Sequence, residues 1–259
     1  FDVSPTWGED GLSERAVAEA VGDRRDEMIY ITRAGLVLRD QGWSSDFGVE
    51  ALRASCEQSL KRLATDRIDV WLLHNPTEAD LRREETANLA EALLREGKIR
   101  AWGAAVSQLD EARAALDAGA QVLSLPFHLL SPRLVWDLEP DVRSRRVGLL
   151  ARSTLAHGLL AGRWTGRKRF TPDDHRSHRW SPEALAERVE QVNDRRFLQR
   201  EPILTMAQAA QRFVLAHDVV SSLVLGARTA SQVEASFEVA GATPYLPAED
   251  LARLRAMDE

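Results

Sequence analysis

Ile68-Asp-Val-Trp-Leu-Leu-His74, followed at once by Asn75-Pro76, is the stretch that decides the fold of this 259-residue chain. Five of its seven residues are apolar. A nearly continuous apolar run that ends in a turn signal predicts a strand buried on both faces, as strands are in parallel sheets. His74 then stands at the C-terminal end of the strand, where reactive groups collect in parallel barrels. Position alone leaves it as either a reactive group or a hydrogen-bonded strand end.

Strand and helix patterns alternate on both sides of this stretch. The other predicted strands cover residues 1–4, 28–32, 99–106, 122–125, 148–153 and 219–225, and we expect a loop over residues 36–45. A helical segment follows each strand, which predicts a parallel sheet with helical crossovers. Seven such units are one fewer than a (β/α)8 barrel contains. The chain opens on strand-like sequence without a methionine, so we expect further residues before Phe1.

Composition excludes several classes of function. The chain has 34 basic and 40 acidic residues, a formal net charge of −6, so nothing favours nucleic acid as a partner. No apolar run approaches the roughly 20 residues of a membrane helix. Cys56 is the only cysteine, which is typical of a protein in a reducing cytoplasm. None of the histidines has the spacing of a metal site, so we expect no metal.

Four segments have the order and content of a known family. They are residues 57–74, with Glu57-Gln-Ser-Leu-Lys-Arg-Leu63 and Leu72-Leu-His74; Leu94–Gly103; Leu155-Ala-His-Gly-Leu-Leu-Ala-Gly162; and Gly226-Ala-Arg-Thr229 with Gln232. Together they resemble the aldo-keto reductases, which are (β/α)8 (TIM) barrels that reduce carbonyls with NADPH and without a metal. The resemblance implies a single barrel domain over residues 1–259, with a covering loop insertion at about 156–200. It also implies that a family strand and helix would precede Phe1.

The resemblance implies a catalytic set of aspartate, tyrosine, lysine and histidine. Asp2 and His74 match the first and last of these. Trp7 stands at the tyrosine position and Arg33 at the lysine position. Tryptophan is a donor that delivers no proton, and arginine stays charged. We therefore expect altered chemistry, with Arg33 paired to Asp2.

The implied cofactor site is retained in part. Its contacts to the phosphates and sugar would be Ser153, Leu155, Gly226, Arg228, Thr229 and Gln232. At the nicotinamide end the family's serine-asparagine pair is replaced by Ala105-Val106, its glutamine by Ser124 and its stacking aromatic by Arg152. At the adenine end an acid and an amide are replaced by Ala235 and Ser236. Use of NADP(H) is therefore an open question at this point.

Three further residues are candidates for substrate binding at the barrel mouth: Trp43, His128 and Arg152. Arginine holds carboxylates and phosphates by paired bonds, so this set favours a small anionic substrate. For Arg152 a solvated strand end is an equally good interpretation.

Three functions remain. We favour acid–base chemistry without redox, such as elimination, isomerisation or cyclisation, with His74 and Asp2 as the titrating groups. The alternative is an NADP(H)-dependent oxidoreductase that reduces a carbonyl with a modified catalytic set. A second alternative is a non-catalytic binding or regulatory subunit. The two enzymatic functions act on a small molecule, and the sequence leaves the oligomeric state open.

Overall fold

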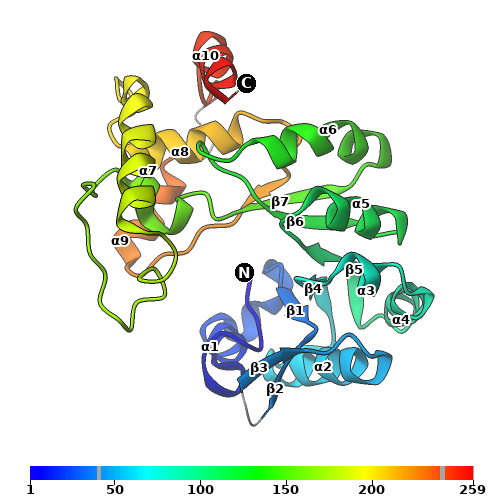
Figure 1. Ribbon diagram of the computed structural model, residues 1–259. Coiled ribbons are helices and arrows are strands. Elements are labelled where there is room, and N and C mark those ends of the chain that lie inside the picture. The colour runs from blue at the N-terminus through cyan, green and yellow to red at the C-terminus, as the bar shows by residue number, and fades with distance from the viewer. Residues whose placement is uncertain (40–41, 240–242, 259) are drawn as a thin grey trace. The chain divides into compact units, whose positions relative to one another are not determined.

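The computed structural model describes residues 1–39, 42–239 and 243–258 (Figure 1). The chain divides into two compact units. Unit 1 consists of Phe1–Leu125 with Leu138–Leu149, and unit 2 of Pro126–Asp137 with Leu150–Glu259. The expectation of a single barrel domain stays a prediction, and each unit is described by itself.

Unit 1 is built on parallel strands in the order β1-β4-β5-β6. Their bounds are β1 Ile31–Ala34, β4 Ile68–His74, β5 Ile99–Ala105 and β6 Val122–Pro126, the last residue of which belongs to unit 2. The bounds predicted for β4 are confirmed to the residue, and four of its five apolar side chains are buried as expected, while Val70 is half-buried. Gly103 of β5 lies against Val122, where an added Cβ would stand 1.7 Å from the carbonyl oxygen. Only glycine permits that approach.

Helices connect and cover these strands. They are α1 Leu12–Val21, α2 Val49–Arg62, α3 Glu78–Leu81, α4 Glu84–Arg95, α5 Leu109–Asp117 and α6 Arg133–Arg145, the last shared between the units, with 3-10 turns at Glu9–Gly11 and Gly22–Glu27. α2 packs one face inward: Leu52 and Cys56, one turn apart, are both fully buried. Figure 1 shows α2 running beside β1.

Two predictions near the start of the chain need correction. Residues 36–45 do not form a plain loop: Leu36–Arg39 (β2) and Gly42–Ser45 (β3) pair as an antiparallel hairpin. The strand predicted over residues 1–4 is reduced to a single parallel bridge between Asp2 and Ile31. Pro5 follows so closely that the chain leaves the sheet at once.

Unit 2 contains the remaining elements. They are β7 Gly148–Arg152, of which the last three residues lie in unit 2, a 3-10 segment η3 Ala156–Ala161, α7 Pro182–Asp194, a 3-10 turn Arg196–Leu198, α8 Met206–Leu215, β8 Ser222–Leu223, α9 Ala230–Phe237 and α10 Ala248–Asp258. β7 and β8 pair in parallel. β8 is shorter than the predicted strand 219–225. A capping box formed by Thr205 and Gln208 begins α8.

No helix among the described residues is long and apolar enough to cross a membrane. Within the same residues, no group of three or more histidine, cysteine, aspartate or glutamate side chains could hold a metal ion.

Candidate functional site

Asp2 and Arg33 form a buried ion pair in unit 1. Arg33 Nη2 donates to Asp2 Oδ2 at 2.6 Å and Arg33 Nε to Oδ1 at 3.3 Å. Both side chains are 5% exposed. The pairing follows from the bridge between Asp2 and Ile31, which sets the aspartate beside β1. Asp2 occupies the Nε–Nη2 edge of the guanidinium, so this edge of Arg33 does not serve as a clamp for a substrate anion.

Trp7 lies on the solvent side of this pair. The Arg33 guanidinium carbon is 5.0 Å from the centroid of the Trp7 ring, a cation–π distance. The Trp7 side chain is 42% exposed, so its indole is open to a ligand. Its N–H can donate a hydrogen bond to an oxygen atom, although it cannot supply a proton.

His74 is the last residue of β4 and is half-buried. In the register of the sheet Arg33 pairs with Leu72, so His74 lies two residues further along the adjacent strand. Asp2, Trp7, Arg33 and His74 are therefore grouped at the C-terminal ends of β1 and β4.

Trp43 lies on the hairpin of unit 1, opposite Leu38 of β2. Both side chains are exposed. The two form an apolar pair on one face of the hairpin. Among the described residues, no hydrogen bond or cation–π contact joins Trp43 to the Asp2–Arg33 pair.

Unit 2 contains a cavity of about 1030 Å³, which we call the cationic cavity. Five of the six predicted cofactor contacts line it, namely Ser153, Leu155, Gly226, Arg228 and Gln232. The sixth, Thr229, is the N-cap of α9, and its side chain accepts from Gln232 N. The structure thus brings these residues together around one space.

Positive charge dominates this cavity. Its lining residues include four arginines, Arg163, Arg176, Arg196 and Arg228, and no aspartate or glutamate is among them; His157 and His175 line it as well. The sequence interpretation did not single out Arg163, Arg176 or Arg196. Two buried polar atoms of lining residues, Thr154 Oγ1 and Gln211 Oε1, have no hydrogen-bond partner within the described structure. Such atoms and charges suit a polyanionic ligand that also carries hydroxyl groups.

The backbone along one wall is strained. Ser153, Ala156 and His157 have φ of 60°, 45° and 59°, values that side-chain-bearing residues rarely adopt. In η3, His157 and Gly158 both have positive φ and interrupt the helical turn. Gly158 packs against Trp164. Left-handed residues of this kind cluster at ligand sites because the surrounding fold holds them in place.

A cover of aromatic and charged residues adjoins this wall. The ring of Trp164 meets those of Phe170 and Trp180 edge to face, with centroid distances of 5.0 and 6.1 Å. Arg176 lies over Trp164 and Phe170 and pairs with Asp174, whose pKa it holds well below its usual range. These residues fall within 156–200, the range in which the covering insertion is expected, and that expectation stays a prediction.

His157 of the cavity wall is held neutral. Burial lowers the pKa of its imidazole to about 4, and Arg179, His175, Arg152 and Arg176 act in the same direction. At neutral pH its role in the cavity is therefore that of a hydrogen-bonding ring.

His128 and Arg152 are neighbours in unit 2. Phe127 N donates to Arg152 O at 3.1 Å, which sets the two segments side by side. Burial lowers the pKa of His128 to about 4. Its Nδ1 accepts from Leu130 N at 3.2 Å. His128 therefore carries no charge near pH 7, and only Arg152 supplies positive charge between these two.

Comparison with known proteins gives one family. The sequence model described as "Aldo/keto reductase family" matches residues 1–259. The chain is 29% identical over 251 residues to Aldo-keto reductase YhdN of Bacillus subtilis, covering 94% of this chain and 75% of that protein. It is 28% identical over 256 residues to L-glyceraldehyde 3-phosphate reductase of Escherichia coli, covering 90% and 72%.

Solved structures agree. The chain is similar to aldo-keto reductase AKR11C1 from Bacillus halodurans in its holo form, with a TM-score of 0.83 and 25% identity over 99% of this chain and 81% of that one. The predicted barrel class is thereby confirmed.

Proposed function

Since the chain belongs to the aldo/keto reductase family, we propose that it is an NADP(H)-dependent oxidoreductase that reduces a carbonyl group of a small molecule. Relatives such as L-glyceraldehyde 3-phosphate reductase are named for reductions. Non-redox acid–base chemistry, which the sequence alone favoured, gains no support from the relatives. The alternative of a reductase fits them better.

The observation that carries the proposal is the cationic cavity. Of the four arginines in the lining, Arg176 is paired with Asp174, and the other three, Arg163, Arg196 and Arg228, would face the phosphates of a dinucleotide and neutralise their charge. Arg228 lies just before the N-terminus of α9, where backbone dipoles also favour anions. Gln232, Thr154 and Gln211 would serve the sugar hydroxyls. NADP(H) therefore fits the residues present.

The bound nicotinamide would supply the hydride in such a reaction. The chain must then hold the carbonyl oxygen and supply a proton. Trp7 would donate a hydrogen bond to that oxygen, with its ring oriented by Arg33. Arg33, fixed by Asp2, would place a positive charge beside the oxygen as negative charge develops on it. His74 is the titratable group of this set that can give up a proton near neutral pH.

The first test concerns cofactor binding. The full-length protein is titrated with NADPH, and tryptophan fluorescence reports the binding. We expect a micromolar Kd, and we expect Arg228→Met to raise it about tenfold or more, because a charge-assisted bond is worth about 1.5–3 kcal/mol. Arg188→Met is the matched control: Arg188 is exposed on α7, bonds to Gln191 and does not line the cavity.

The second test concerns carbonyl reduction. It measures the oxidation of NADPH in the presence of aldehydes, including L-glyceraldehyde 3-phosphate. Turnover that falls with His74→Ala supports the proposed roles. Binding without turnover of any aldehyde would overturn the oxidoreductase assignment. Absence of binding at millimolar NADPH would overturn the cofactor assignment as well.

A further inference from the structure

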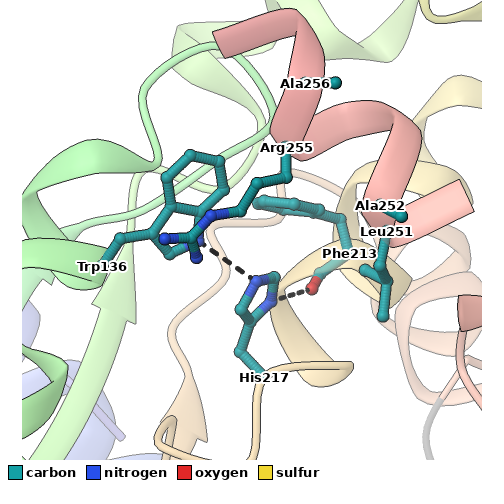
Figure 2. Close-up of a pocket in the computed structure, with 7 residues that line it drawn as sticks. All are labelled: Trp136, Phe213, His217, Leu251, Ala252, Arg255 and Ala256. Atoms are coloured by element: carbon teal, nitrogen blue, oxygen red, sulfur yellow. Dashed lines mark hydrogen bonds between the residues drawn. The ribbon is translucent and has the colours of Figure 1, made fainter. Parts of the chain in front are cut away.

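The polar groups of the smaller cavity in unit 2 are engaged with one another (Figure 2). This cavity has a volume of about 380 Å³ and lies between α8, α10 and the first turn of α6. Trp136 Nε1 donates to His217 Nε2 at 3.3 Å, and His217 Nδ1 donates to Phe213 O at 2.8 Å. The guanidinium carbon of Arg255 stands 4.4 Å from the centroid of the Trp136 ring and covers it. Because these groups already have partners, the cavity serves the packing of α10.

Charged side chains in the segment before α7 lack such partners. Four of them are exposed, and we call them the basic set: Arg167, Lys168, Arg169 and Arg179. None of the four forms a salt bridge within the part of the chain that the structure describes. Asp174 of the same segment is paired with Arg176, and only Asp173 is left to offset the basic set. The segment therefore keeps a net positive charge.

The other contacts of the basic set leave its charges accessible. Arg169 Nη1 donates to the carbonyl oxygen of Lys168 at 3.2 Å. Lys168 Nζ lies 5.6 Å from the ring centroid of Phe170, and the guanidinium carbon of Arg179 lies 5.8 Å from that of Trp180. Both distances are close to the limit of about 6 Å for cation–π contact, and both cationic side chains remain exposed.

The exposed face of α7 carries the opposite charge. Leu185, Val189 and Val192 are buried on its inner face. Four exposed carboxylates lie on the other side at spacings of four, three and four residues, which align them in one stripe. We call them the acidic face: Glu183, Glu187, Glu190 and Asp194. Among the described residues they too form no salt bridge.

The basic set and the acidic face are neighbours on unit 2. Gly166 packs against Ala186 of α7, where an added Cβ would stand 3.1 Å from the Ala186 Cβ. The next residue along each segment belongs to the basic set and to the acidic face, respectively. Hydrogen bonds from its own backbone N–H and from Ser181 lower the pKa of Glu183, and the charge of Arg169 lowers it further. One surface therefore presents both signs of charge.

The direction of α7 makes the acidic face unfavourable without a positive partner. The last turn of the helix contains no basic residue, whereas Asp194 ends it and Glu190 stands one turn earlier. Carboxylates are disfavoured at the negative end of the helix dipole, and like charges one turn apart repel each other. A positive surface placed against this face would relieve both effects.

We propose that this surface binds a second copy of the chain. In a pair with twofold symmetry, the basic set of each protomer lies against the acidic face of the other, because such an interface brings each patch to its complement twice. A nucleic acid or an anionic membrane would meet the acidic face together with the basic set, so it would fit only half of the surface. This inference does not depend on the oxidoreductase assignment.

Sedimentation velocity of the full-length protein tests the proposal. At about 20 mM NaCl we expect a reversible dimer with a Kd on the order of 100 µM, since a small and charged interface is at the weak end of protein association. Raising NaCl to about 500 mM shortens the Debye length from about 20 Å to about 4 Å and should raise the Kd at least about tenfold.

Charge reversal locates the interface. The basic set is altered in Arg167→Glu with Lys168→Glu, and the acidic face in Glu187→Lys with Glu190→Lys. Each variant alone should dimerise at least about tenfold more weakly, because both halves of its symmetric interface lose attraction. Mixed in equal amounts, the two variants should form a mixed dimer. One half of that interface is unaltered, and in the other half the reversed charges oppose each other.

A matched control reverses two carboxylates elsewhere. Glu84→Lys with Glu85→Lys changes the net charge by the same amount as the acidic-face variant, at exposed residues in the first turn of α4 in unit 1. This control should dimerise as the unaltered protein does.

Three outcomes overturn the proposal. They are a monomer at about 500 µM protein and about 20 mM NaCl, an unaltered Kd in both reversed variants, and a mixture of the two that associates no more than either alone. Circular dichroism checks folding, and the single changes Lys168→Glu and Glu187→Lys replace any double variant that does not fold.

Discussion

Asp2 and Arg33 show at the scale of single residues why the candidate site is also structural. Two charges removed from water stabilise the fold only while they compensate each other. The pair ties the first residues of the chain to β1 and orients Trp7 through Arg33. A change at either residue therefore affects folding before it affects chemistry.

Replacing Asp2 by Asn leaves the Arg33 charge buried without its partner. We expect the free energy of unfolding to fall by about 3–5 kcal/mol, and the double variant Asp2→Asn with Arg33→Met to recover part of it. Urea denaturation measures both. The exposed pair of Arg24 with Glu27 is the control, and Glu27→Gln should change stability by less than about 0.5 kcal/mol. If Asp2→Asn also lowered the free energy of unfolding by less than about 0.5 kcal/mol, Asp2 and Arg33 would not form a buried ion pair.

His128 makes stability depend on pH. Its pKa is lowered to about 4 in the folded state, so between pH 6.5 and 4 the unfolded chain binds a proton that the folded chain does not. Stability due to this residue is therefore present above pH 6.5 and lost as pH falls towards 4, to the order of 3 kcal/mol.

His128→Asn keeps an acceptor for Leu130 N and does not titrate. We expect the free energy of unfolding of this variant to decline less steeply between pH 6.5 and 4 than that of the unaltered protein. Thermal or urea unfolding at several pH values in that range measures both slopes. A slope equal to that of the unaltered protein would show that His128 is charged when folded.

At the scale of elements, α10 is attached chiefly by charge. Among its described side chains only Asp250 and Leu254 are buried. Arg200 bonds to Asp250 at 2.5 Å, and Arg195 to Asp258 at 2.8 Å. Arg195 also donates to two main-chain carbonyls, those of Leu129 and Gln191. One arginine thus anchors the C-terminal turn of α10.

Arg195→Met should loosen α10 before the rest of unit 2. Asp258 would lose its partner while burial still raises its pKa, and we expect a cost of about 2–4 kcal/mol. Hydrogen exchange should show faster exchange in α10 than in α8. Arg188→Met on α7 is again the control. Equal acceleration in both helices would contradict an anchoring role for Arg195.

At the scale of the whole molecule, the sequence predicted the fold well where pattern and burial agree. β4 was predicted to the residue because its apolar run serves one purpose, burial in the sheet. The hairpin of Leu36–Arg39 and Gly42–Ser45 was missed because much of it is exposed and its residues follow no strict alternation. The strand predicted over residues 219–225 was too long because five of the seven residues are apolar, although only Ser222 and Leu223 pair.

The residues of the cationic cavity also fall into two groups, those that the sequence could identify and those that it could not. Gly226, Arg228 and Gln232 could be recognised because they share a turn and the helix that follows it. Arg163, Arg176 and Arg196 could not, since they reach the cavity through a segment without periodic pattern. Their position depends on the path of the folded chain, which local sequence does not encode.

The four arginines of the cationic cavity also have a kinetic consequence. The chain as a whole carries a formal charge of −6, so a distant anion is weakly repelled, whereas one near the cavity meets a concentrated positive field. Capture of an anion there depends on ionic strength through its association rate constant, while the dissociation rate constant depends on contacts already made. For the dinucleotide proposed above, the cavity would therefore set the association rate as well as the strength of binding.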